Sequence, residues 1–201
     1  MGWSTGRGDS LMSPLYGRTA TFLAGSRRTN LALARTLISS LTKSRVPCAV
    51  LDIDALYSSN SDYIFASASE EEARGTNLIV PEPGSVLEAE LANLLSSCSA
   101  KVLIIDSLNS LYHQLSEGER GSKNSNLAFA VALLSYVART EKKAVILTMY
   151  QRERAARFGQ RRPISELSEL AVSVSMREET LVLACERGSA WPGKRLSLSI
   201  P

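Results

Sequence analysis

Residues Lys101 to Leu111 read KVLIIDSLNSL, and this stretch decides the fold. Four apolar residues, Val102 to Ile105, run without interruption into Asp106. Such a run predicts a strand that is buried on both faces of a parallel sheet. In open α/β sheets the carboxyl ends of the strands form the edge where ligands bind, so Asp106 is the first candidate site residue. The alternative is an Asp that caps the turn after the strand, and this stretch alone does not separate the two.

Apolar strands alternate with helical patterns on both sides of this stretch. Strands are predicted at Thr19–Ala24, Val46–Leu51, Asn77–Val80 and Ala144–Met149, and helices at Asn30–Leu41, Ser85–Ser97 and Leu127–Thr140. A further helix is expected to end near Glu70–Glu72, and Ser116–Asn126 is expected to be a polar loop. This rhythm indicates parallel βαβ units.

The last third of the chain has a different pattern. Leu170–Met176 and Leu181–Glu186 flank a short polar turn, which predicts an antiparallel hairpin, and Leu196–Ile200 predicts a final strand. The sequence therefore predicts an α/β fold with a mostly parallel central sheet, flanking helices and a C-terminal antiparallel hairpin.

Length and composition set the domain organisation. A chain of 201 residues with 44% hydrophobic and 21% charged residues suits one globular α/β domain. Residues 1–17 are rich in Gly and Ser and are expected to form a flexible arm, so the domain is expected to span residues 18–201.

The remaining composition excludes several classes of site. The three cysteines lie far apart, which favours a reducing compartment over a disulfide framework or a structural zinc site. His113 is the only histidine, and a multi-histidine metal site needs more than one. No apolar stretch approaches the roughly 20 residues that span a bilayer, so we expect a cytoplasmic chain with no membrane partner.

The loop Gly25–Thr29 follows a predicted strand and precedes a predicted helix, where a phosphate-binding loop would lie. Its sequence, GSRRT, does not fit the pattern GxxxxGK[ST], because Arg27 replaces the second glycine and Arg28 replaces the lysine. Glycines let such a loop turn its amides toward phosphates, and a planar guanidinium does not replace a compact ammonium group. We therefore expect Gly25, Ser26, Arg27, Arg28 and Thr29 to form a degenerate loop. The expectation is that binding of ATP and magnesium is weak or lost.

The chain as a whole resembles the ATPase core of the RecA superfamily. The resemblance rests on the first strand, loop and LALA-containing helix, on KVLIIDSLNSLYHQ, on AVILTMYQ and on the closing hairpin. It is strongest to archaeal and eukaryotic recombinases and to their RadB-like and KaiC-like relatives, and it covers residues 17–201. The resemblance implies the RecA-like P-loop fold, with Asp106 at the place of the magnesium-binding Asp of P-loop nucleoside triphosphatases.

The resemblance also assigns catalytic positions, which are altered in this chain. Asp54, or alternatively Asp52, matches the family's glutamate that activates water, and it is one methylene shorter. The segment 148–151, TMYQ, matches the Asn-Gln pair that senses the last phosphate, but its register differs by one residue. With the lysine absent as well, Asp54 and Asp106 are expected to be vestigial. The chain is expected to be a pseudo-ATPase with no catalytic residue, no metal and no cofactor.

Two polar segments correspond to the loops that hold DNA in the family. The first contains Arg120 and Lys123, and the second is the segment 152–162, RERAARFGQRR. The second segment contains a single acid. Its five arginines and one aromatic residue are Arg152, Arg154, Arg157, Phe158, Arg161 and Arg162. Arginines that contact phosphates beside an aromatic side chain that stacks on bases are typical of single-strand binding. A solvated loop or a surface for an acidic protein is the alternative.

These observations lead to two function hypotheses. The first is a catalytically degenerate recombinase paralogue that binds single-stranded DNA and a recombinase or sister paralogue, and that acts in homologous recombination and DNA repair. The second is a non-catalytic ring subunit of an Elongator-like or KaiC-like assembly, which serves RNA modification or regulation. The resemblance implies a homo- or hetero-oligomer in either case.

Overall fold

The structure is a computed structural model, and it describes residues 9–82, 87–97, 99–114, 120–150, 167–188, 190–191 and 195–201. These residues form one sheet of eight strands in the order β3-β2-β4-β5-β1-β6-β7-β8. The strands are β1 (Arg18–Ala24), β2 (Cys48–Asp52), β3 (Thr76–Ile79), β4 (Val102–Asp106), β5 (Ala144–Tyr150), β6 (Leu170–Arg177), β7 (Thr180–Arg187) and β8 (Arg195–Ser199). Within this sheet β7 is antiparallel to both of its neighbours, and every other pair of adjacent strands is parallel.

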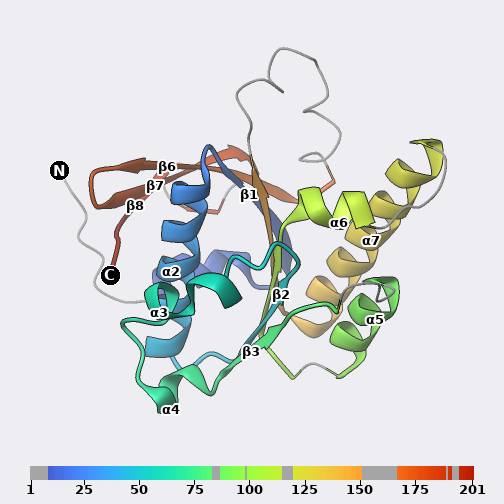
Figure 1. Cartoon of the computed structure of the whole chain (residues 1–201). Helices are drawn as coiled ribbons and strands as arrows, with labels where there is room; N and C mark the ends of the chain where they lie inside the picture. The colour runs from blue at the N-terminus through green and yellow to red at the C-terminus, as the bar shows by residue number, and fades with distance from the viewer. Residues whose placement is uncertain are drawn as a thin grey trace.

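Helices cover both faces of the parallel part of the sheet (Figure 1). They are α1 (Asp9–Met12), η1 (Ser13–Leu15), α2 (Arg27–Lys43), η2 (Ser58–Asn60), α3 (Ser61–Ile64), α4 (Glu70–Ala73), α5 (Leu87–Ser97), α6 (Leu108–Gln114) and α7 (Arg120–Glu141). The core on one face joins α2 and α3 to the sheet, and the core on the other face joins α5, α6 and α7 to it. The described chain is therefore a three-layer α/β/α arrangement.

The central strands are buried because helices pack on both of their faces. All five residues of β4 are buried, and so are all five of β2. Successive side chains of a strand point to opposite faces, so Ile104 joins the α2 side and Ile105 the α5–α7 side. The uninterrupted apolar run predicted this arrangement correctly, and the prediction of an α/β fold with a mostly parallel sheet and a C-terminal antiparallel hairpin is confirmed.

Three local predictions differ from the structure. The expected polar loop Ser116–Asn126 already belongs to α7 from Arg120 onward. The single helix expected to end at Glu70–Glu72 is replaced by the short helices α3 and α4. Residues 9–15 form α1 and η1 rather than a flexible arm, and the side chains of Leu11, Met12 and Leu15 are buried in the core beside α2. Burial of these three apolar side chains stabilises the ordered conformation of the segment.

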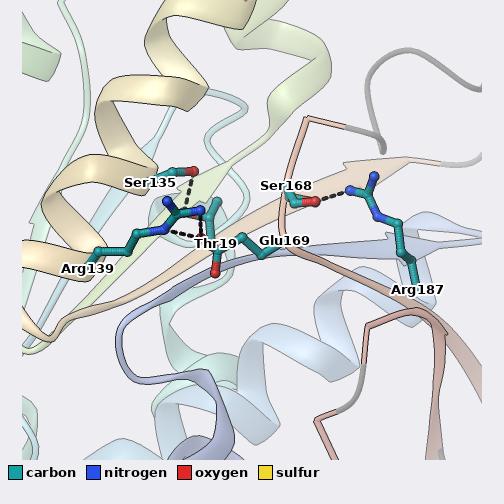
Figure 2. Close-up of polar contacts among 6 residues, drawn as sticks. All are labelled: Thr19, Ser135, Arg139, Ser168, Glu169 and Arg187. Carbon is teal, nitrogen blue, oxygen red and sulfur yellow. Dashed lines mark hydrogen bonds and ion pairs between the residues drawn. The ribbon is translucent and has the colours of Figure 1, made fainter.

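Polar contacts join α7 to the start of β6 (Figure 2). The Arg139 Nε donates a hydrogen bond of 2.6 Å to the Glu169 carboxylate, and the Ser135 hydroxyl lies 3.0 Å from the Thr19 hydroxyl of β1. The Arg187 guanidinium donates to the Ser168 carbonyl. These contacts fix the segment before β6 at the amino end of β1.

Among the described residues, none of the helices combines the length and the apolar character needed to cross a membrane.

Candidate functional site

The carboxyl ends of β4 and β5 and the first turn of α2 meet at one edge of the sheet. Asp106 ends β4, Thr148 lies near the end of β5, and Asn30 lies in the first turn of α2. The Asn30 Nδ2 donates a hydrogen bond of 2.9 Å to Asp106 Oδ1, and the Thr148 hydroxyl donates to the same oxygen. All three side chains are buried, with at most 2% exposed. The candidate site is therefore a buried polar cluster.

One oxygen of this cluster's carboxylate is not used within the described chain. Asp106 Oδ2 and Asn30 Oδ1 are buried and have no hydrogen-bond partner among the described residues. Burial raises the pKa of Asp106 from its usual 3.8 to about 6, and the hydrogen bonds from Thr148 and Asn30 counteract part of that rise. The negative charges of Asp54 and Asp52 add to the rise. The carboxyl group is thus poised to change protonation near neutral pH.

Tyr150 closes the cluster on the solvent side. The Asn30 Nδ2 lies 3.0 Å from the Tyr150 hydroxyl, and the Tyr150 backbone amide donates to Asn109 Oδ1 at 3.0 Å. Burial, and then the charge of Asp106, raise the pKa of Tyr150 to about 12. The phenol therefore stays protonated, and its hydroxyl group remains a hydrogen-bond donor as well as an acceptor.

The two other acids at this edge have different surroundings. Asp52 is fully buried, and its carboxylate accepts hydrogen bonds from the amides of Tyr57 at 3.1 Å and Ser58 at 2.8 Å. It therefore holds the turn that follows β2. Asp54 is half-buried, and its two oxygens accept hydrogen bonds from the hydroxyls of Ser107, at 2.6 Å, and Ser110. Of the two acids proposed for the water-activating role, only Asp54 thus contacts residues that follow Asp106.

The connection between β1 and α2 is a two-residue turn. β1 ends at Ala24 and α2 begins at Arg27, so that only Gly25 and Ser26 lie between them. The Ser26 hydroxyl caps the helix by accepting a hydrogen bond of 3.1 Å from the Thr29 amide. Gly25 does not adopt a positive φ. The turn is thus a capped helix start, without the left-handed glycine geometry of a phosphate-cradling loop.

Arg27, Arg28 and Thr29, which were predicted to belong to the loop, form the start of α2. Arg27 and Arg28 are exposed, whereas Thr29 is buried and its hydroxyl lies 2.9 Å from the Ser26 hydroxyl. Arg27 is close enough to Tyr150 for its charge to lower the pKa of the phenol, against the effect of burial. The degenerate loop therefore lies beside the buried cluster, with its cations on the solvent side.

None of the eight predicted nucleic-acid residues has a described side chain. Arg120 and Lys123 belong to the first turn of α7, and their side chains are not described. Arg152, Arg154, Arg157, Phe158, Arg161 and Arg162 lie outside the described residues.

Sequence reasoning missed the partners of Asp106. Asn30 appeared only as the first residue of a predicted helix, and Thr148 and Tyr150 only within the segment 148–151, which the resemblance matched to the pair that senses the last phosphate. Their meeting depends on the position of β5 between β4 and β1, which is a tertiary feature. Within the described part of the chain, no group of three or more His, Cys, Asp or Glu side chains could hold a metal ion.

No protein-family model matches this chain, and no curated protein matches it.

Proposed function

We propose that this chain is an accessory protein with a RecA-like fold that has lost nucleotide chemistry, and that it binds single-stranded DNA and a partner recombinase or paralogue. The observation that carries the proposal is the two-residue connection between β1 and α2. In this connection the Ser26 hydroxyl already accepts the hydrogen bond of the Thr29 amide. A nucleotide's phosphates would need several free amides at this position.

The acids of the edge give a second argument. Asp54 accepts hydrogen bonds from two serine hydroxyls, and one oxygen of Asp106 accepts from both Asn30 and Thr148. Asp54 would have to give up one of these partners in order to bind a metal ion or orient a water molecule. Asp106 keeps one oxygen, Oδ2, without a partner among the described residues, but that oxygen is buried. The cluster is therefore better suited to a structural role than to hydrolysis.

The nucleic-acid part of the proposal rests on the composition of the segment 152–162. Its five arginines follow β5 in the sequence, and β5 ends at the same edge of the sheet as the degenerate loop. Arginine contacts with phosphates give strong, salt-dependent affinity for single strands. A role in homologous recombination and repair follows from the RecA resemblance together with this basic segment.

The nucleotide part is tested by calorimetric titration of the chain with ATP and magnesium. We expect no binding at micromolar concentrations of nucleotide. The double variant Arg27→Gly/Arg28→Lys serves as a comparison, because it restores the residue types of a phosphate-binding loop at two exposed positions. A micromolar dissociation constant for the unaltered chain would overturn this part.

The nucleic-acid part is tested by fluorescence anisotropy with a labelled single-stranded oligonucleotide. We expect Arg161→Glu/Arg162→Glu to weaken binding by at least about tenfold at low salt, because each reversal removes a phosphate contact and adds a repulsion. The matched control is Arg177→Glu/Arg195→Glu, which reverses two exposed arginines of the C-terminal strands. Equal effects of the two pairs would contradict a specific role of the segment. Markedly tighter binding of tRNA than of single-stranded DNA would favour the RNA-modification alternative.

A further inference from the structure

β8 is the last strand on one side of the sheet, at the far end from β3 (Figure 1). It runs antiparallel to β7, with Leu196 opposite Leu183 and Ser199 opposite Thr180. No strand of the described chain pairs with the other side of β8, which we call its open side. Backbone N–H and C=O groups that point to the open side of such a strand can pair with another chain.

The register of β7 and β8 shows which backbone groups point to the open side. The Ile200 amide, just after β8, donates a hydrogen bond of 2.9 Å to the Glu179 carbonyl, just before β7. In an antiparallel pair, residues that bond to the neighbouring strand alternate with residues whose N–H and C=O groups point away from it. Every second residue before Ile200 therefore bonds to β7. The backbone groups of the others point to the open side: Arg195, Ser197 and Ser199.

The side chains of β8 alternate in the same way. Leu196 and Leu198 are partly buried and pack against the core on the α2 face of the sheet. The side chains of Arg195, Ser197 and Ser199 are exposed, and they lie on the opposite face because successive side chains of a strand point to opposite faces. A strand that paired with the open side would therefore meet leucines on one face and small polar residues on the other.

β8 lacks the features that usually protect the last strand of a sheet from pairing. These features include a proline within the strand, a charged side chain that points inward and a β-bulge. The sequence of β8 is RLSLS, so it contains no proline, and its inward-facing residues are leucines. Its pairing with β7 has no bulge. The open side of β8 is thus suited to pairing with another strand.

β8 is complementary to itself in one antiparallel register. In this register Ser197 lies opposite Ser197 of a second copy, and Arg195 lies opposite Ser199 of the second copy. Each residue that points to the open side then pairs with another such residue, so that their N–H and C=O groups all find partners. A shift of two residues in either direction would leave Arg195 or Ser199 outside the pairing.

The side chains agree with the same register. Leu196 lies opposite Leu198 of the second copy, which joins apolar side chains on the core face of the two sheets. Arg195 lies opposite a serine and not opposite another arginine, so no like charges oppose one another across the pair. β8 carries no acid and a single cation, so its charge does not select a strongly charged partner instead.

We propose that the open side of β8 is the interface of a two-fold symmetric dimer, in which the β8 strands of two copies pair antiparallel around Ser197 and join two sheets into one. Pairing of two five-residue strands buries less surface than the roughly 1,200–2,000 Å² of a stable complex. We therefore expect a dissociation constant in roughly the micromolar range. The interface does not rest on the proposed function, because that function concerns the carboxyl edge of the sheet.

Sedimentation equilibrium of the full chain between about 1 and 200 μM tests the proposal, and we expect a monomer–dimer equilibrium. Ser197→Pro removes an N–H that points to the open side and that β7 does not use, and proline is tolerated at such positions of a last strand. This variant is expected to dimerise at least about tenfold more weakly than the wild-type chain, because the pair loses hydrogen bonds at its centre. Ser197→Ala is the matched control. It keeps the N–H and is expected to dimerise like the wild-type chain.

Charged variants at the same position test the two-fold register. Ser197→Lys and Ser197→Glu each place two like charges opposite one another, and each is expected to weaken its own dimer by at least about tenfold at low salt. In a mixture of the two variants, opposite charges meet at this position. We expect the mixed dimer to form at least about tenfold more tightly than the dimer of either variant alone. Sedimentation with one variant fluorescently labelled measures this.

Three results would overturn the proposal. The first is a chain that stays monomeric over the whole concentration range. The second is a dimer that Ser197→Pro and Ser197→Lys leave unchanged, because the interface would then lie elsewhere, for example at β3. The third is a failure of the mixture to restore dimerisation. Thermal unfolding shows whether each variant is folded. If Ser197→Pro is unfolded, the two charged variants of this exposed residue decide the outcome.

Discussion

Two groups of polar side chains at opposite edges of the same sheet have opposite surroundings. At the carboxyl edge Asp106, Asn30 and Thr148 are buried and bind one another. At the amino edge Lys101 and Lys142 are exposed and face solvent. The comparison teaches that a polar residue at a strand end is not in itself a sign of a binding site. Whether its groups are already bound inside the protein decides what it can still bind.

This difference has a physical cause. A buried polar group must find a partner or destabilise the fold, so the carboxyl-edge residues act on stability. An exposed cation keeps its hydration and contributes little to folding, so the amino-edge residues are available to a partner. Substitutions at the two edges should therefore separate stability from binding.

The largest effect is expected at Asp52. Asp52→Ala leaves the amides of Tyr57 and Ser58 without their carboxylate inside the protein. We expect the free energy of unfolding to fall by about 3–4 kcal/mol, because each hydrogen bond to a buried charged group contributes about 1.5–3 kcal/mol. Urea unfolding measures this. Asp54→Ala is the matched control, with an expected loss of about 1 kcal/mol at a half-buried site. Equal losses would contradict the different roles assigned to the two acids.

Asp106 should show the next effect, and it depends on pH. Its pKa in the folded chain, about 6, lies above the usual 3.8, so the folded state binds the proton more tightly than the unfolded state. The contribution of Asp106 to stability is therefore full below the unfolded pKa and is lost as the pH rises through about 6. Asn cannot ionise. The stability of Asp106→Asn relative to wild type should thus increase by about 2 kcal/mol between about pH 4 and pH 7.

The measurement is urea unfolding of both proteins across that range. The comparison of the two proteins cancels the other carboxyl groups, which titrate in both. If the difference in the free energy of unfolding between the two proteins does not change with pH, the Asp106 carboxyl group is solvated. The cluster at this edge would then not be buried.

Thr148 gives a smaller test of the same cluster. Thr148→Val keeps the shape of the side chain but removes the hydroxyl that donates to Asp106. We expect a loss of about 2 kcal/mol in the free energy of unfolding, because the carboxylate loses one donor. Thr148→Ser keeps the hydroxyl and is expected to lose less than Thr148→Val. The reverse order would mean that the methyl group, and not the hydrogen bond, matters at this position.

The smallest effect is expected at the amino edge. Lys101→Glu and Lys142→Glu reverse exposed charges there. We expect each to change the free energy of unfolding by no more than about 0.5 kcal/mol, as for most surface substitutions. Urea unfolding at moderate salt measures this. A loss of several kcal/mol would show that these lysines are structural and would remove the contrast between the edges.

Much of the fold was predictable from local patterns. The apolar run before Asp106 predicted a strand buried on both faces, and the alternation of strands and helices predicted a mostly parallel sheet. These features follow from the period of the hydrophobic residues, which is local information. The short segments were less predictable. α1 and η1 have too few residues to show a helical pattern in the sequence, and burial of Leu11, Met12 and Leu15 stabilises their structure.

The sequence by itself determined that Asp106 ends a central strand and that arginines follow the first strand where a phosphate-binding loop has glycine and lysine. Only the tertiary structure decided what surrounds them. The order of strands puts β5 beside β4, so Thr148 reaches Asp106 from 42 positions away, and Asn30 reaches it from 76 positions away. A hollow at the amino edge is likewise lined by residues that lie far apart in the sequence, among them Tyr16 and Ser44. Contacts of this kind depend on the crossover connections of the chain, and no local periodicity encodes which strands become neighbours.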